Sequence, residues 1–163
     1  MRDSRKRLWA VGALVCVCSL GVGCGLAQAQ DAYTTWQSNY FGCTTCTQAA
    51  GTADPLGKGT INTNQFMLGL NPTNSASIFR IISLVRTGNN ILVTWKAGGG
   101  KTNALQVTSG RADGSYSNNF HDIISIILTG SGDVTTNYTD VGAATNAPTR
   151  LYRIRLAPAP QVG

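Results

Sequence analysis

Runs of apolar and β-branched residues recur through residues 77–157, separated by short segments rich in Gly, Asn and Ser. Such runs at regular spacing, with turn residues between them, predict the strands of an antiparallel β-sandwich. The expected strands cover residues 78–86, 91–96, 104–108, 123–128, 134–141 and 151–156. The sequence therefore predicts a mostly β domain over this range.

Residues 30–76 have a helical rather than a strand-like pattern. Aromatic side chains three or four positions apart predict a short amphipathic helix over residues 32–41, which ends near Gly42. These aromatic residues are Tyr33, Trp36, Tyr40 and Phe41. A turn at residues 54–59 leads to a second short helix over residues 61–69, which Gly69 and Pro72 end. We expect a small helix–loop–helix region in front of the sandwich.

The N-terminus has the three parts of a secretory signal peptide. Basic residues within positions 2–7 precede an uncharged apolar run, which ends in Ala27-Gln28-Ala29. We therefore predict that residues 1–29 are removed by cleavage between Ala29 and Gln30. One alternative is a membrane anchor, because the run approaches the ~20 residues that span a bilayer, although four glycines interrupt it. The other is a lipid on Cys24, although Gly21 stands where bacterial lipoproteins usually have leucine.

Composition supports one exported domain with a small appendage. Cleavage leaves 134 of the 163 residues, of which 158–163 form a Pro-containing tail. Glutamate is absent, whereas Thr, Asn, Ser and Gly are abundant, and this favours strands and turns over long helices. The whole chain has a formal charge of +6, but the mature part has nine basic and six acidic residues. So small and scattered an excess is not a nucleic-acid-binding footprint, and we expect no nucleic-acid partner and no membrane span in the mature chain.

Two stretches resemble known families. Residues 54–66, DPLGKGTINTNQF, followed by LGLNPTN at 68–74, resemble the calcium loop of bacterial exported proteins with thrombospondin type 3-like or dockerin-like repeats. Residues 93–95, 99–102, 137–140 and 152–155 look like parts of the fibronectin type III-like β-sandwich that often follows such loops. The resemblance implies a fibronectin type III-like architecture, with Trp95 on an early strand packed against Tyr152, rather than a particular activity.

The resemblance also implies a calcium loop, but most ligand positions have changed. A working loop needs hard oxygen ligands at positions one, three, five, seven, nine and twelve, with Gly at six. Asp54, Gly59 and Asn62 keep positions one, six and nine. Leu56, Lys58 and Gln65 occupy positions three, five and twelve, where the family has acidic residues. We expect no bound metal and no cofactor here, and instead the Lys58 ammonium near Asp54 and the carbonyl groups of the Gly-rich turn.

Cys43 and Cys46 are the only cysteines after the predicted cleavage site. In an oxidising compartment a nearby pair favours a structural disulfide. A thioredoxin-like pair would need a helix that starts at the first cysteine. A zinc site would need two more ligands, and His121 is the only histidine that could supply one. We predict a Cys43–Cys46 disulfide.

No catalytic signature is complete, so we expect no catalytic residues and no enzyme. Residues 98–102, GGGKT, lack the earlier glycine of a phosphate loop, because position 95 is Trp, and they predict a turn. His121 and Asp122, with Ser117 or Ser125, lack the Gly-x-Ser-x-Gly elbow of a hydrolase. Arg153 and Arg155 are expected to be solvated residues of an edge strand.

These observations favour an exported, non-enzymatic β-sandwich module in adhesion or in organisation of the cell envelope or surface. We expect it to be secreted, periplasmic or at the cell surface, with a cell-surface protein or a glycan as partner. The alternative is a carbohydrate-binding module, which needs two or three exposed aromatic rings on one face. Tyr116, Phe120 and Tyr138 are the candidates, although Tyr138 should alternate towards the core.

The first prediction concerns export. Expression in a host that secretes the protein should yield a chain that begins at Gln30 or its cyclised form, because peptidase cleaves after Ala-x-Ala. N-terminal sequencing and intact mass measure this directly. An intact Met1, or a lipid on Cys24, would contradict the assignment.

Overall fold

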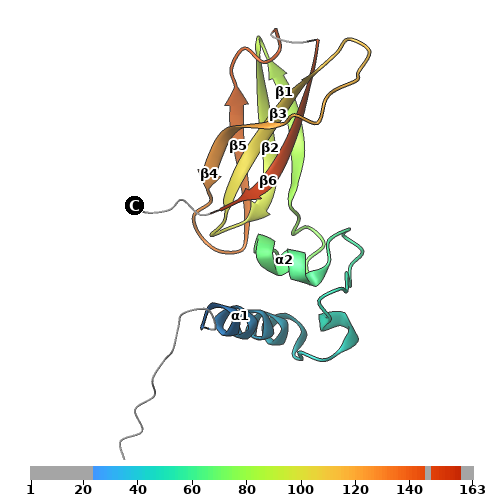
Figure 1. The fold of residues 1–163 in the computed structure, drawn as a ribbon, viewed down its shortest axis with the longest axis vertical. Helices are drawn as coiled ribbons and strands as arrows, with labels where there is room; N and C mark the ends of the chain where they lie inside the picture. The colour runs from blue at the N-terminus through green and yellow to red at the C-terminus, as the bar shows by residue number, and fades with distance from the viewer. Residues whose placement is uncertain (1–23, 146–147, 159–163) are drawn as a thin grey trace, which may run out of the picture.

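The structure, a computed structural model, describes residues 24–145 and 148–158. Residues 1–23, which hold most of the predicted signal peptide, lie outside the described residues, as do the end of the tail and residues 146–147. In the described part, a helical N-terminal region lies against one end of a six-stranded β-sandwich (Figure 1).

The helical region contains α1 (Cys24–Phe41), a short 3₁₀ helix η1 (Thr47–Ala49) and α2 (Asn62–Leu68). Helix α1 begins earlier than the predicted residue 32 and passes through the predicted cleavage site. It ends at Gly42, whose φ of 70° is left-handed and whose N–H bonds to the Ser38 carbonyl at 2.9 Å. Gly69 ends α2 in the same way, with a φ of 70°.

An aromatic cluster packs α1 against α2. The ring of Phe66 on α2 lies 5.2 Å from Tyr33 and 5.9 Å from Trp36, centroid to centroid. Tyr40 and Phe41 contact Trp36 edge-on at 5.3 and 6.0 Å. Edge-to-face pairs at these separations add about 0.5–1.5 kcal/mol each to simple burial. The predicted packing of Phe66 against Trp36 is therefore present, and every ring in the cluster follows Gln30.

Six strands form the sandwich: β1 (Arg80–Thr87), β2 (Asn90–Gly98), β3 (Thr102–Gly110), β4 (His121–Ile127), β5 (Asp133–Asp140) and β6 (Thr149–Ala157). One sheet has the order β1-β2-β5 and the other β4-β3-β6, and every pairing is antiparallel. The mostly β class and the two antiparallel sheets are thus as predicted. Bulges interrupt the pairing between Ile81 and Ser83 on β1 and between Leu105 and Gln106 on β3.

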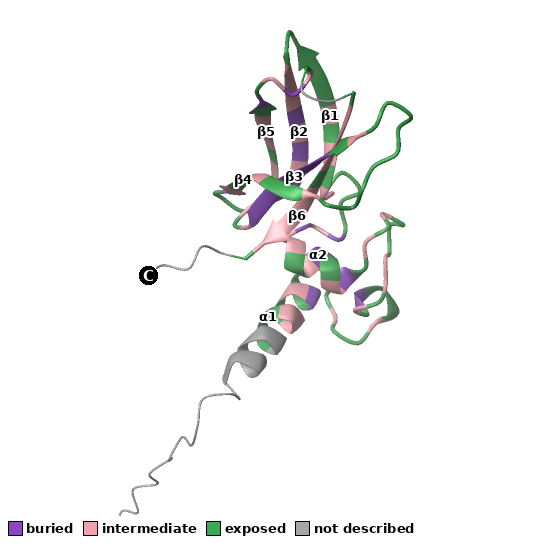
Figure 2. Ribbon diagram, turned by 45° about the horizontal axis from the view of Figure 1, so that its top comes forward, coloured by how far each residue is buried: buried purple, intermediate pink, exposed green. Residues whose placement is uncertain are grey.

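The core lies between the two central strands, β2 and β3, where Figure 2 shows the buried residues. Trp95 is fully buried, as predicted, together with Val93 and Leu105. The indole N–H of Trp95 donates to the Asn103 side-chain oxygen across the sheets at 3.2 Å. A buried Trp needs such a partner, because an unpaired N–H in the core costs free energy.

The Gly98-Gly99-Gly100 segment forms the turn between β2 and β3, and a close approach explains its first glycine. A Cβ at Gly98 would overlap the carbonyl oxygens of Leu68 and Gly69 at the end of α2. The N–H groups of Gly99 and Gly100 bond to the carbonyls of Gly132 and Leu128, each at 2.7 Å. Glycine here lets the helical region sit directly on the sandwich backbone.

The second prediction tests this contact. Gly98→Ala should lower the free energy of unfolding by about 1–3 kcal/mol, because the added methyl group must push α2 away from the sheet. Urea denaturation of the purified protein measures the change. Gly88→Asn is the control, since Gly88 has a φ of 61° with no atom within 4 Å and Asn tolerates this conformation. Equal stability of the two variants would mean that α2 does not press on Gly98.

Candidate functional site

The turn that resembles a calcium loop is held by hydrogen bonds to Asp54. Its carboxylate accepts the backbone N–H of Lys58 at 3.0 Å, of Gly59 at 2.6 Å and of Thr60 at 3.2 Å. These bonds, the one from Lys58 first, lower the pKa of Asp54. The carboxylate therefore closes the turn on itself.

The Lys58 ammonium interacts with the Asp54 charge, as predicted, but it bonds to other carbonyls than those predicted. It donates to three backbone carbonyls, those of Asn71 at 2.8 Å, Asn74 at 3.2 Å and Ser77 at 3.1 Å. The expectation that it would bond to the Gly-rich turn carbonyls was wrong, because the long side chain reaches over to the 71–77 loop. Burial lowers the pKa of Lys58. The ammonium thus joins the turn to the loop that leads into β1.

The side chains at ligand positions nine and twelve of the loop, Asn62 and Gln65, face the packed interior. Both are fully buried. Asn62 donates to the carbonyls of Gln48 and Ala50 at 2.8 and 2.9 Å, and Gln65 donates to the Thr60 carbonyl at 2.6 Å. They hold neighbouring turns and are not gathered around Asp54. Within residues 24–145 and 148–158, no group of three or more His, Cys, Asp or Glu could hold a metal ion.

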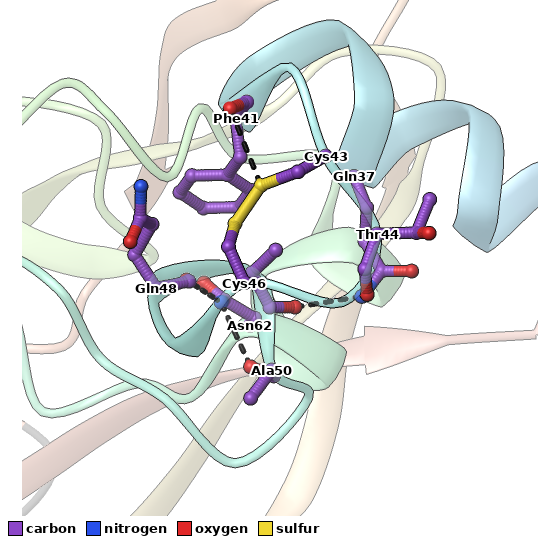
Figure 3. The surroundings of a disulfide bond; sticks show 9 residues. Gln37, Phe41, Cys43, Thr44, Cys46, Gln48, Ala50 and Asn62 are labelled. Carbon is purple, nitrogen blue, oxygen red and sulfur yellow. Dashed lines mark hydrogen bonds between the residues drawn. A yellow bond between two sulfur atoms is a disulfide. The ribbon is translucent and has the colours of Figure 1, made fainter.

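Cys43 and Cys46 lie at disulfide distance, with their Cα atoms 6.0 Å apart (Figure 3). The pair follows the end of α1, so no helix begins at its first cysteine as a thioredoxin-like site requires. Gln37 of α1 donates to the Ala49 carbonyl at 2.7 Å beyond the pair. The disulfide and this bond together fold residues 43–49 back on α1.

Asp122, which follows His121 at the start of β4, is bonded to Arg155 and Gln106. The Asp122 carboxylate accepts two bonds from the Arg155 guanidinium and one from Gln106 at 2.6 Å. These bonds, the one from Arg155 first, lower the pKa of Asp122. Ser117 instead donates to Asn119 at 2.6 Å, and Asp122 orients no imidazole. Among the described residues, no hydrogen bond joins His121 to Asp122, Ser117 or Ser125.

Arg153 and Arg155 are held more firmly than the sequence suggested. Arg153 donates to Gln106 at 2.6 Å and to Asn118 at 3.3 Å, and its guanidinium lies 4.1 Å over the Phe120 ring. Arg155 forms the ion pair with Asp122. Both side chains stay accessible on an edge strand, as expected, while Gln106 of β3 binds Arg153 and Asp122 of β4 binds Arg155.

Tyr116, Phe120 and Arg153 form what we call the arginine–ring patch on the outer face of the β4-β3-β6 sheet. The Tyr116 and Phe120 rings meet nearly at right angles, 6.1 Å apart. Tyr116 is 53% exposed, which is a large exposed fraction for an aromatic side chain. The third candidate ring, Tyr138, packs against the core cluster, as its alternation predicted.

A hollow of about 320 Å³ adjoins the patch. Its lining combines three serines with one guanidinium and the Tyr116 ring: Ser109, Arg111, Ser115, Tyr116 and Ser117. Sequence reasoning named Tyr116 and Phe120 but missed Arg153, because only the sheet register brings that side chain to the loop. Such a surface can stack on a flat ligand and donate hydrogen bonds.

No helix within the described residues is long and apolar enough to span a membrane.

The third prediction concerns Lys58 and calcium. Calorimetric titration should show no calcium binding below millimolar concentration, because a divalent ion needs summed negative charge and Lys58 brings a cation to the site. Lys58→Met should lower the free energy of unfolding by about 1–3 kcal/mol, since it removes three charged hydrogen bonds. Lys96→Met, on β2 away from the loop, is the control and should change stability by less than about 0.5 kcal/mol. Micromolar calcium affinity, or a chelator-sensitive melting temperature, would contradict this interpretation.

Comparison of the chain with protein-family models, with curated proteins and with solved structures found no match in any of the three.

Proposed function

We propose that this chain is an exported, non-enzymatic β-sandwich module that acts in adhesion or in organisation of the cell envelope or surface, with a fibronectin type III-like sandwich. It binds its partner, a cell-surface protein or a glycan, through the arginine–ring patch. The observation that carries the proposal is the exposed Tyr116 ring beside Phe120 and Arg153.

The patch has the properties of a recognition surface. Aromatic and arginine side chains are enriched where proteins bind partners, because they offer large contact area with few rotatable bonds. Arg153 is already fixed by Gln106 and Asn118, so little conformational entropy is lost when a ligand contacts it. The patch lies on a sheet rather than on loops alone, which gives it a rigid support.

The arrangement of the titratable groups supports a binding rather than a catalytic role. The Asp122 and Asp140 carboxylates each form an ion pair with an arginine. A general base must instead be free to accept a proton from substrate. The packing of Trp95 with Tyr152 against one core cluster supports the fibronectin type III-like architecture.

A carbohydrate-binding module is the second candidate, and one observation favours it. Three serines and the Tyr116 ring line the hollow beside the patch, and the Phe120 ring lies against Tyr116. Sugar rings stack on aromatic faces while their hydroxyl groups exchange hydrogen bonds with small polar side chains. Only one of the three candidate rings, Tyr116, is exposed, since Phe120 is half-buried and Tyr138 points into the core, and this is fewer than the two or three exposed rings that such a module needs.

The fourth prediction separates the two candidates. We expect the purified protein to bind intact cells or extracted envelope of its source, and Tyr116→Ala to reduce that binding about tenfold or more, as loss of a hot-spot ring does. A glycan array with the same protein decides the partner class. Binding to one family of glycans would assign the carbohydrate-binding function instead of a protein partner.

Val141→Ala is the matched control, because Val141 is 75% exposed and lies outside the patch. It should leave binding unchanged within about twofold. Equal binding by wild type and the Tyr116→Ala variant, with both folded, would show that the patch is not the binding surface.

A further inference from the structure

Strand β1 of one sheet lies beside β6 of the other along one long side of the sandwich (Figure 1). A hollow of about 300 Å³ lies between the two strands there. We call this place the β1–β6 seam and define it by five of its lining residues: Leu84, Arg86, Ile91, Arg150 and Tyr152. The arginine–ring patch lies on the outer face of the β4-β3-β6 sheet, and the two surfaces share strand β6.

Leu84 shows that the core is uncovered at the seam. Leu84 pairs directly with Val93, and directly opposed residues of an antiparallel pair lie on the same face of the sheet. Val93 is fully buried in the core, so Leu84 also points between the sheets, yet it is 53% exposed. An inward apolar side chain this exposed indicates that the described residues of the facing sheet do not cover it.

The facing sheet ends at β6. In the described part of the chain, β6 pairs with β3 alone, so its other edge presents backbone N–H and C=O groups without ladder partners. A further strand on this edge would lie opposite β1 and cover Leu84. Exposed edges of this kind are the sites at which extended peptides add to a sheet.

Hydrogen bonds hold two side chains that line the seam in place before any partner binds. Asp140 of β5 accepts hydrogen bonds from Arg150 and from the Tyr152 hydroxyl, each at 2.8 Å, and so ties the two sheets together. Burial first, and then the bond to Asp140, raise the pKa of Tyr152 to about 12. Because Arg150 and Tyr152 are already held, they need not reorganise when a strand docks.

We propose that the β1–β6 seam is the docking site for an extended strand of a partner protein, in which apolar residues alternate with acidic ones. The strand pairs with the free edge of β6, and its apolar side chains cover Leu84. Its acidic side chains lie on the other face, beside Arg153.

The positive charge of strands β1 and β6 favours an acidic partner strand over a second copy of this chain. Strands β1 and β6 contain five arginines and no acidic residue: Arg80, Arg86, Arg150, Arg153 and Arg155. Edge-to-edge pairing of two copies would oppose guanidinium groups, and like charges directly opposite each other destabilise a ladder. The tail of the same chain is also a poor strand here, because Pro158 and Pro160 have no N–H to donate.

The fifth prediction uses a blocked nine-residue peptide that alternates valine with aspartate, labelled for fluorescence anisotropy, and the full chain. The peptide should bind saturably, and hydrogen exchange should show new protection of β6 amides within residues 149–153. Leu84→Asp should weaken binding about tenfold or more, whereas Val85→Asp should leave it within about twofold. Val85 is the matched control, because it is 48% exposed but points to the outer face.

Arg86→Glu is a second variant that leaves Leu84 in place, and it should weaken binding of the acidic peptide because it replaces a nearby positive charge with a negative one. A peptide that alternates valine with lysine should not bind. The proposal is overturned if the aspartate peptide does not bind, if Leu84→Asp and Val85→Asp act alike, or if protection appears on β4 or β5. It is also overturned if sedimentation shows a dimer that Leu84→Asp dissociates, since the occupant would then be a second copy.

Discussion

The burial of Trp95 between two narrow sheets is the interaction on which the rest of the sandwich depends. With three strands in each sheet, the central strands β2 and β3 must supply most of the core. Trp95 fills that space, and Asn103 from the opposite sheet satisfies its N–H. The Asn103 amide nitrogen has no partner of its own, so the core accepts one unsatisfied polar group to pair the indole. The described residues of the facing sheet also leave Leu84 uncovered at the β1–β6 seam.

Backbone contacts and the hydrogen bonds of the Lys58 ammonium join the helical region to this sandwich. Gly98 allows the end of α2 to rest on the turn between β2 and β3. Lys58 binds three carbonyls of the 71–77 loop, and two side chains of that loop, Asn74 and Ser77, bond to Asp133 at the start of β5. The ammonium adds a charged donor to these carbonyls, of which those of Asn71 and Asn74 also accept a backbone N–H. Lys58 therefore links the turn at residues 54–60 to the 71–77 loop, and that loop is bonded to β5 of the sandwich.

Strand β6 places its arginines in two different environments. Arg150 points between the sheets, where Asp140 and Tyr152 surround its charge, while Arg153 and Arg155 lie on the outer face. Outside, Gln106 bridges Arg153 to Asp122, which in turn pairs with Arg155. This network holds Arg153 of the arginine–ring patch in place. The bonds of Asp140 to Arg150 and Tyr152 hold the side chains that line the seam. One strand thus contributes to both proposed binding surfaces.

The sequence by itself determined the helical region, the six strands, the burial of Trp95 and the packing of Phe66 on Trp36. Each follows from local periodicity and from the need to bury large apolar side chains. Only the tertiary structure decided where charged side chains end: Lys58 reaches the 71–77 loop, and Arg153 and Arg155 meet Gln106 and Asp122. Long flexible side chains can reach several partners, and strand register selects among them. The open seam also depends on how the strands divide between two sheets, which local periodicity does not specify.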